Sequence, residues 1–245
     1  IFLIQVIIFG LMSGLTILVS QYWGKQDIEA INRCMGFAAY TGVCITALAA
    51  LILFTFPTQV LSLVTNNSIL IEMGAPYLKI VGISYIFNAV SSVYVSMQRS
   101  AENPSLGMKV FACSMLLNTF LNYCLIFGNF GAPALGITGA AVATLISRIA
   151  EFLLVVLYVL FSRRVPLMPR QFLRPGRDTA RSFIRYATPV LLNETLWGLG
   201  TTVMTAILGH MADSADMLAA YTIMGNVDKF TTVSCFGLAG ATAVI

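Results

Sequence analysis

The chain has 245 residues, of which 58% are hydrophobic and only 10% charged, and its mean hydropathy is +0.86. A soluble domain carries about a quarter charged residues, so this chain lacks the polar side chains that a water-exposed surface needs. Its five cysteines are too few and too irregularly spaced for a secreted disulfide scaffold. The composition therefore predicts a polytopic membrane protein.

Seven apolar stretches are long enough, or nearly so, for a helix across a bilayer, which takes about 20 residues. They show no sustained alternation of apolar and polar residues, so we expect helices and not a β-barrel. The stretches are 1–20, 36–56, 77–97, 110–128, 136–161, 184–209 and 217–245. The sequence thus predicts an all-α fold with seven transmembrane helices. Because both ends of the chain fall inside apolar runs, we expect an internal fragment of a longer protein.

Lysine and arginine are divided unevenly between the loops. The loops at 57–76, 129–135 and 210–216 hold none, whereas eleven of the fourteen basic residues lie in or beside the alternate loops. The positive-inside rule places these eleven residues on the cytoplasmic side. We therefore expect the net charge of +4 to serve membrane topology and contact with the lipid bilayer, and we expect no nucleic-acid partner. The eleven are Lys25, Arg33, Arg99, Lys109, Arg163, Arg164, Arg170, Arg174, Arg177, Arg181 and Arg185.

The longest loop, residues 162–183, contains six arginines and three prolines. This composition favours a solvated, poorly helical connector between two bundles. It divides the chain into an N-terminal bundle at 1–161, without its first helix, and the start of a truncated C-terminal bundle at 184–245.

A short repeat supports this division. Phe9-Gly10-Leu11 in the first stretch recurs as Phe236-Gly237-Leu238 in the last. The two segments are six helices apart and so run in the same direction, which is the geometry of a parallel repeat of six-helix halves.

Four further segments resemble motifs of the multidrug and toxic compound extrusion (MATE) family. They are Ser20–Asp27, Met97–Pro104, Asn118–Gly128 and Gly136–Thr144. The resemblance implies a bundle of two six-helix halves, of which this chain holds helices two to eight. It also implies a multi-pass secondary antiporter of the bacterial inner membrane. Such a carrier exports organic cations or similar lipophilic small molecules in exchange for H⁺ or Na⁺, and we expect it to be a monomer.

Glu194 is the strongest candidate for the cation-coupling residue. No basic residue lies within one helical turn of it, so burial would favour its neutralisation by a proton or Na⁺. It also resembles the acidic residue that the family carries in its seventh helix. The alternative is a structural carboxylate capped by Asn193 or Thr195 near the start of the helix.

Other charged residues inside the stretches are few. Asp228 and Lys229 are adjacent, so they cannot face the same partner, and Asp228 is the second cation-coupling candidate. Arg148 and Glu151 are three residues apart on one helix. A structural ion pair between them is favoured over an ion pathway.

Polar and aromatic residues supply candidates for a substrate cavity. Asn118 and Asn122 share a helix face and could either bond neighbouring helices or line the cavity. Trp197 and Tyr85 could offer aromatic faces to a lipophilic cation, although packing is their commoner use.

The chain shows no motif for catalysis, ATP binding or a metal site. We therefore expect a protein that is not an enzyme and has no cofactor beyond its coupling ion. Two alternatives stay open: a flippase of related fold for lipid-linked saccharides, and a seven-helix retinal receptor with Lys229 in its last helix.

Overall fold

The computed structural model describes residues 2–161, 165–211 and 214–242, and within these ranges the chain contains helices and no strand. The all-α prediction is confirmed. Residue 1, residues 162–164 and residues 243–245, which belong to the predicted first stretch, connector and last stretch, lie outside the described ranges. The helices are α1 (Phe2–Gly24), α2 (Ile28–Thr55), α3 (Pro57–Ser62), α4 (Ser68–Ser100), α5 (Pro104–Phe127), the 3₁₀ helix η1 (Asn129–Gly131), α6 (Gly136–Phe161), α7 (Pro169–Leu173), α8 (Arg177–Gly209) and α9 (Ser214–Thr242).

Polar residues, proline and glycine set the ends of these helices. The side-chain oxygens of Asp27 and Asn67 each accept a hydrogen bond, at 3.0 Å, from a backbone N–H in the first turn of α2 and α4. Pro104 is the first residue of α5, where its missing N–H costs no hydrogen bond. Gly128 ends the same helix in the left-handed conformation, at φ 74°.

Four helices begin six or more residues earlier than the apolar pattern predicts. Helix α2 starts at Ile28 instead of 36 and α4 at Ser68 instead of 77. Helix α5 starts at Pro104 instead of 110 and α8 at Arg177 instead of 184. The prediction that the connector is poorly helical is therefore wrong for much of its described part, which contains α7 and the first turns of α8. The apolar stretch marks the length that suits a bilayer, whereas backbone hydrogen bonds continue the helix through polar residues on either side.

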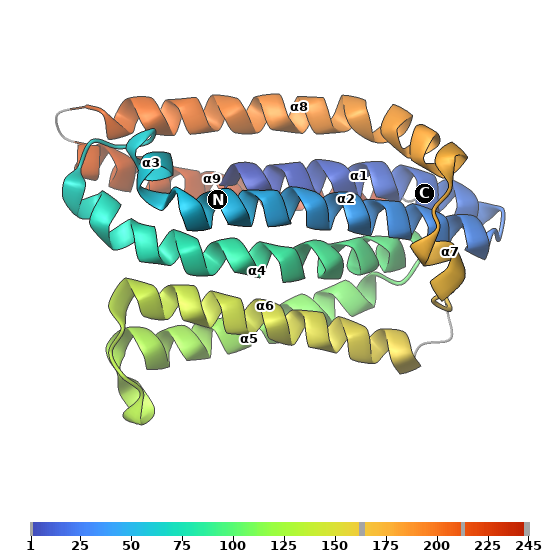
Figure 1. Ribbon diagram of the computed structural model, residues 1–245, viewed down its shortest axis with the longest axis horizontal. Helices are drawn as coiled ribbons and strands as arrows, with labels where there is room; N and C mark the ends of the chain where they lie inside the picture. Colours follow the sequence, from blue (N-terminus) through green and yellow to red (C-terminus); the bar gives the residue numbers. More distant parts are fainter. Residues whose placement is uncertain (1, 162–164, 212–213, 243–245) are drawn as a thin grey trace.

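The long helices lie side by side along the long axis of the molecule (Figure 1). Helix α8 lies along one edge, α5 and α6 lie along the other, and α1, α2 and α4 fill the space between them. The buried apolar core is centred on this middle layer, where Leu15, Val19, Ile31 and Ala38 have no exposed surface. The first bundle packs around α4, which contacts α1, α2, α5 and α6.

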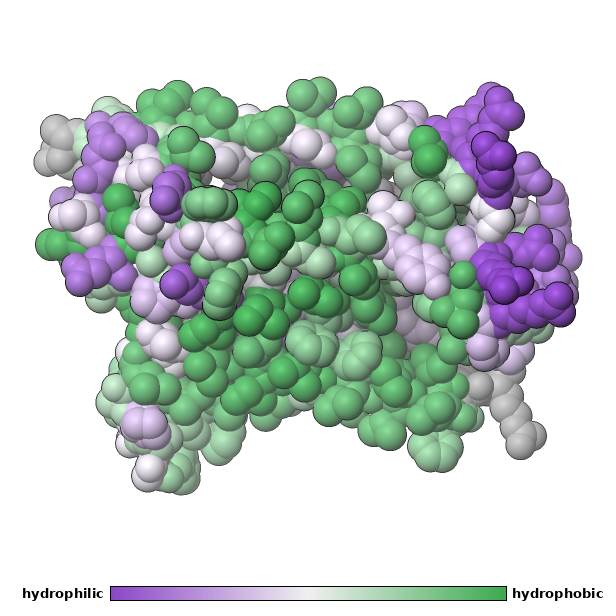
Figure 2. Space-filling view, in the orientation of Figure 1, coloured by the Kyte–Doolittle hydropathy of each residue, from purple (hydrophilic) through white to green (hydrophobic). Residues whose placement is uncertain are grey.

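Five helices in the described ranges are long and apolar enough to cross a membrane: α1, α2, α4, α5 and α6. Helices α8 and α9 are as long but do not reach the same apolarity, so their membrane crossing stays a prediction. Figure 2 shows a broad apolar band across the middle of the visible face, with hydrophilic residues gathered at the two ends. This distribution fits a bundle that stands across a bilayer.

Candidate functional site

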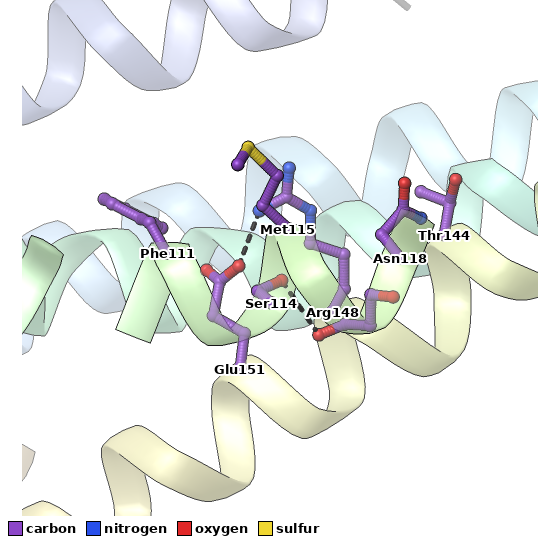
Figure 3. Close-up of a pocket in the computed structure, with 8 residues that line it drawn as sticks. Phe111, Ser114, Met115, Asn118, Thr144, Arg148 and Glu151 are labelled. Carbon is purple, nitrogen blue, oxygen red and sulfur yellow. Dashed lines mark hydrogen bonds and ion pairs between the residues drawn. The ribbon is translucent and has the colours of Figure 1, made fainter. Parts of the chain in front are cut away.

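A pocket of about 400 Å³ lies between α5 and α6. Most of its lining side chains are polar, although the two helices that carry them are among the apolar candidates for membrane crossing. Arg148, Asn118 and Thr144 extend to the same side of the two helices (Figure 3). The lining residues are Phe111, Ser114, Met115, Asn118, Thr144, Ser147, Arg148 and Glu151.

Helices α5 and α6, which carry the pocket, approach each other closely at one glycine. A Cβ atom added at Gly139 would lie 2.4 Å from the backbone oxygen of Leu125, so only glycine allows this contact. Ala141 and Ala143, which follow it on α6, have no exposed surface. The small residues at the start of α6 therefore pack closely against α5 at Gly139.

Arg148 and Glu151 form an ion pair on α6, with 2.6 Å between Arg148 Nη1 and Glu151 Oε2. The Glu151 side chain has no exposed surface, whereas that of Arg148 is 32% exposed. The second carboxylate oxygen of Glu151 is buried without a hydrogen-bond partner in the described residues. The pair thus places a neutralised carboxylate, with one free acceptor atom, at the wall of the pocket.

Asn118 and Asn122 bond to each other along α5, with 3.0 Å between Asn122 Nδ2 and Asn118 Oδ1. Only Asn118 lines the pocket. The side-chain oxygen of Asn122 is buried and has no partner among the described residues. The two asparagines are therefore joined by a hydrogen bond, and Asn118 is the one that faces the pocket.

Glu194 lies in a different place, at the contact between α8 and α1. A Cβ atom added at Gly10 on α1 would lie 3.5 Å from Glu194 Cβ, and one added at Gly14 would lie 2.4 Å from Ala187 Cβ. Gly198, one turn further along α8, meets Val6 in the same way. We call this glycine-lined contact between α1 and α8 the seam. Glu194 is half-buried there and forms no ion pair in the part of the chain that the structure describes.

The other predicted site residues lie on three different helices, α4, α8 and α9. Tyr85 is buried in the core on α4, and Trp197 is 58% exposed on α8, where its ring lies edge-on to Phe2 of α1 at 5.6 Å. Asp228 is exposed on α9, which contacts only α8 among the described helices. Helix α8 makes no contact with α5 in the described ranges. Of the four predicted cavity residues, Asn118 lines the pocket between α5 and α6, and the shared cavity stays a prediction.

Sequence reasoning did not single out Ser114, Thr144 and Ser147, which line the pocket. The signal was present in the spacing of the α6 residues. Positions 144, 147, 148 and 151 follow the 3.6-residue period of one helix face and are all polar or charged, inside an otherwise apolar helix.

Comparison with known proteins decides the family. A sequence model described as MatE matches residues 1–124, half of the chain. The chain belongs to the MATE family. A relative described as probable multidrug resistance protein NorM, from Thermotoga maritima, is 27% identical over 243 residues, which cover 97% of this chain and 51% of the relative. Probable multidrug resistance protein YoeA of Bacillus subtilis is 26% identical over 247 residues, with 99% and 53% covered.

The fold of this MATE chain is shared with a solved structure described as the inward-facing conformation of a multidrug resistance MATE family transporter of the MOP superfamily. The TM-score is 0.83 at 18% identity, and the match covers 98% of this chain and 54% of that one. The chain thus spans about half the length of the relatives that it matches. It is a MATE-fold membrane bundle, as its motifs predict.

Proposed function

We propose that the full-length protein is a secondary active antiporter, which exports lipophilic organic cations in exchange for H⁺ or Na⁺ by alternating access. The observation that carries the proposal is the position of Glu194. It is a carboxylate without a basic partner along its own helix, and it lies where α8 of the second bundle packs on α1 of the first.

An unpaired carboxylate at this position can couple two fluxes. Its charged form is costly in apolar surroundings, so it favours a bound H⁺ or Na⁺ when no other cation neutralises it. An organic cation can neutralise the same carboxylate. Entry of one cation then releases the other, and each exchange leaves Glu194 ready for the next.

The seam suits the motion that alternating access requires. Its close contacts are made by glycines, and no side-chain hydrogen bond joins α1 to α8 in the described residues. Two helices held by shape alone can change their angle without breaking directional bonds. Glu194 would then face a different side of the membrane as the two bundles rock.

Two observations support organic cations as the substrate class: the names of the relatives and the negative charge of the Glu194 carboxylate. Both relatives are named as probable multidrug resistance proteins, and a carboxylate site selects positively charged solutes. Asp228 is a second candidate carboxylate for coupling on α9. The polar pocket at Asn118 and the exposed ring of Trp197 offer additional surfaces to such a solute.

We place the protein in the bacterial inner membrane, where it acts as a monomer.

One observation favours a second function. Arg148 is partly exposed at the pocket wall, and a cationic side chain there would suit the pyrophosphate of a lipid-linked saccharide. Against this flippase function, Glu151 neutralises the same guanidinium, so the pocket lining has no net charge. A pyrophosphate carries more than one negative charge and would need unpaired cations. The seven-helix retinal receptor is set aside by membership of the MATE family.

The test is dye efflux from cells that lack their own exporters and express the full-length protein. We expect Glu194→Gln to abolish efflux at an unchanged protein level, because glutamine cannot exchange a cation. Glu72→Gln is the matched control, since Glu72 is an exposed carboxylate near the start of α4, and it should leave efflux intact. Collapsing the proton gradient and removing Na⁺ in separate arms then identifies the coupling ion. Wild-type efflux from Glu194→Gln would refute the coupling role.

A further inference from the structure

A second cavity, of about 340 Å³, lies at the end of the molecule where α7 packs on α2. Three of its five lining side chains are arginines. We call it the arginine pocket, and Figure 2 shows densely hydrophilic surface at this end of the molecule. Its lining residues are Glu29, Arg33, Arg170, Gln171 and Arg174.

The arginine pocket is held in shape by a buried contact behind it. Asn32, which has no exposed surface, donates from Nδ2 to the backbone oxygen of Pro166 at 3.1 Å. Its Oδ1 accepts from the backbone N–H of Met168 at 3.0 Å. One turn along α2, a Cβ atom added at Gly36 would lie 2.0 Å from the backbone oxygen of Phe172, so only glycine lets α7 sit this close. The connector is therefore fastened to α2, and Arg170 and Arg174 are carried on a fixed support.

The charges in the pocket do not balance. Arg33 pairs with Glu29 at 3.3 Å. Neither Arg170 nor Arg174 forms an ion pair in the described ranges. The lining thus carries three positive charges and one negative charge, and arginine is the side chain best shaped to hold a phosphate through paired N–H donors.

An apolar surface runs from the arginine pocket along the outside of α2. Tyr40 is 43% exposed, Leu48 is 61% exposed and Leu51 is 60% exposed. Together with Arg33 they recur at helical spacing on one face of a helix that is apolar and long enough to cross a membrane. Leu173, beside Arg174, is also exposed, and its backbone oxygen lies 3.5 Å from the Tyr40 hydroxyl. Arg170 and Arg174, which form no ion pair in the described ranges, therefore lie at one end of an exposed apolar stripe.

We propose that the arginine pocket binds the phosphate group of one anionic phospholipid, whose acyl chains lie along the exposed face of α2. The phosphate is held by Arg170 and Arg174 from the connector and by Arg33 from α2. A free phosphate ion carries the same chemistry, but it would gain nothing from the apolar stripe. The bound lipid ties the connector between the two bundles to one leaflet of the membrane.

The test titrates the full-length protein, purified in a neutral detergent, with phosphatidylglycerol and counts bound lipids by native mass spectrometry. We expect one lipid to bind more tightly than those that follow. Each arginine at an anionic lipid headgroup changes affinity by about fivefold, so Arg170→Gln/Arg174→Gln should weaken the tight lipid by at least about tenfold. Arg177→Gln/Arg181→Gln removes the same charge from exposed positions outside the pocket and should leave the tight lipid in place.

Further arms separate the sources of the phosphate and guard against misfolding. Phosphatidylcholine, which has no net charge, should bind at least about tenfold more weakly, and inorganic phosphate should not displace phosphatidylglycerol at equal concentration. Arg170→Lys/Arg174→Lys keeps the charge and should retain most of the binding. An equal loss in the two glutamine variants would mean diffuse surface charge, and displacement by inorganic phosphate would mean a site for the free ion. Either result overturns the proposal.

Discussion

Helix α1 contacts its neighbours α4 and α8 in different ways. Toward α4, inside the first bundle, Thr16 Oγ1 lies 3.0 Å from Ser96 Oγ in a buried hydrogen bond, and Ser96 also donates to the backbone oxygen of Met12 at 3.4 Å. Toward α8, across the seam, the contact is made by Gly10 and Gly14 without such bonds in the described residues. Positions 14 and 16 are about 200° apart around the helix, so they face nearly opposite sides.

The difference separates a fixed contact from one that can move. A hydrogen bond specifies both distance and direction, and breaking it in an apolar interior leaves unpaired polar atoms. A glycine contact specifies only how near the backbones can come. The ionisable groups follow the same division: Glu151 inside the first bundle is paired with Arg148, whereas Glu194 at the seam has no ion-pair partner in the described residues.

The largest effect should come from unpairing the buried carboxylate of the first bundle. Arg148→Gln leaves Glu151 buried and charged without its partner, and we expect a loss of about 3 kcal/mol in the free energy of unfolding. The double variant Arg148→Gln/Glu151→Gln removes both charges and should lie within about 1 kcal/mol of the wild type. Unfolding of the full-length protein in mixed micelles measures both. If the single variant is as stable as the double, the pair does not fix the first bundle.

The next effect should come from the seam. In Gly14→Ala the new Cβ would lie 2.4 Å from Ala187 Cβ and 2.7 Å from its Cα, so the two helices must separate. Such overpacking costs about 2 kcal/mol, and we also expect slower efflux because the bundles no longer fit. Gly200 on α8 has no atom within 4 Å of an added Cβ. Gly200→Ala should therefore be neutral or slightly stabilising, by up to about 1 kcal/mol. Equal effects of the two substitutions would show that the seam is not a close contact.

The sequence predicts the helices well because their signals are local. The length of each apolar stretch and breakers such as Pro57, Pro104 and Gly128 suffice to place the long helices in order. The helix starts at Ser68 and Arg177 escape this reasoning, since polar residues continue a helix as readily as they leave one. Hydropathy predicts which residues can lie in a bilayer, but it does not predict the residue at which the backbone hydrogen bonds of a helix end.

The candidate site is harder to predict because it depends on which faces meet. Glu194 stands out from a count of charges along one helix, and this needs no knowledge of packing. The pocket at Asn118 lies between α5 and α6, and the periodicity of neither helix shows in advance which of their faces meet. The sequence groups Tyr85 and Trp197 with Asn118 by chemistry alone, and the structure places them on α4 and α8, outside the lining of the pocket.

The smallest effect should come from the hydrogen bond that joins α1 to α4. Thr16→Val keeps the shape of the side chain but removes its hydroxyl, leaving Ser96 with its weaker bond to Met12. A hydrogen bond between membrane helices contributes about 0.6 kcal/mol, and the loss should appear in the unfolding free energy without slowing efflux. Thr119→Val is the control, because the exposed Thr119 hydroxyl donates within its own helix, to the backbone oxygen of Met115 at 2.9 Å, and to no other helix that the structure describes. If Thr16→Val slowed efflux as much as Gly14→Ala, both faces of α1 would take part in the motion, and the contrast between a fixed contact and a movable seam would fail.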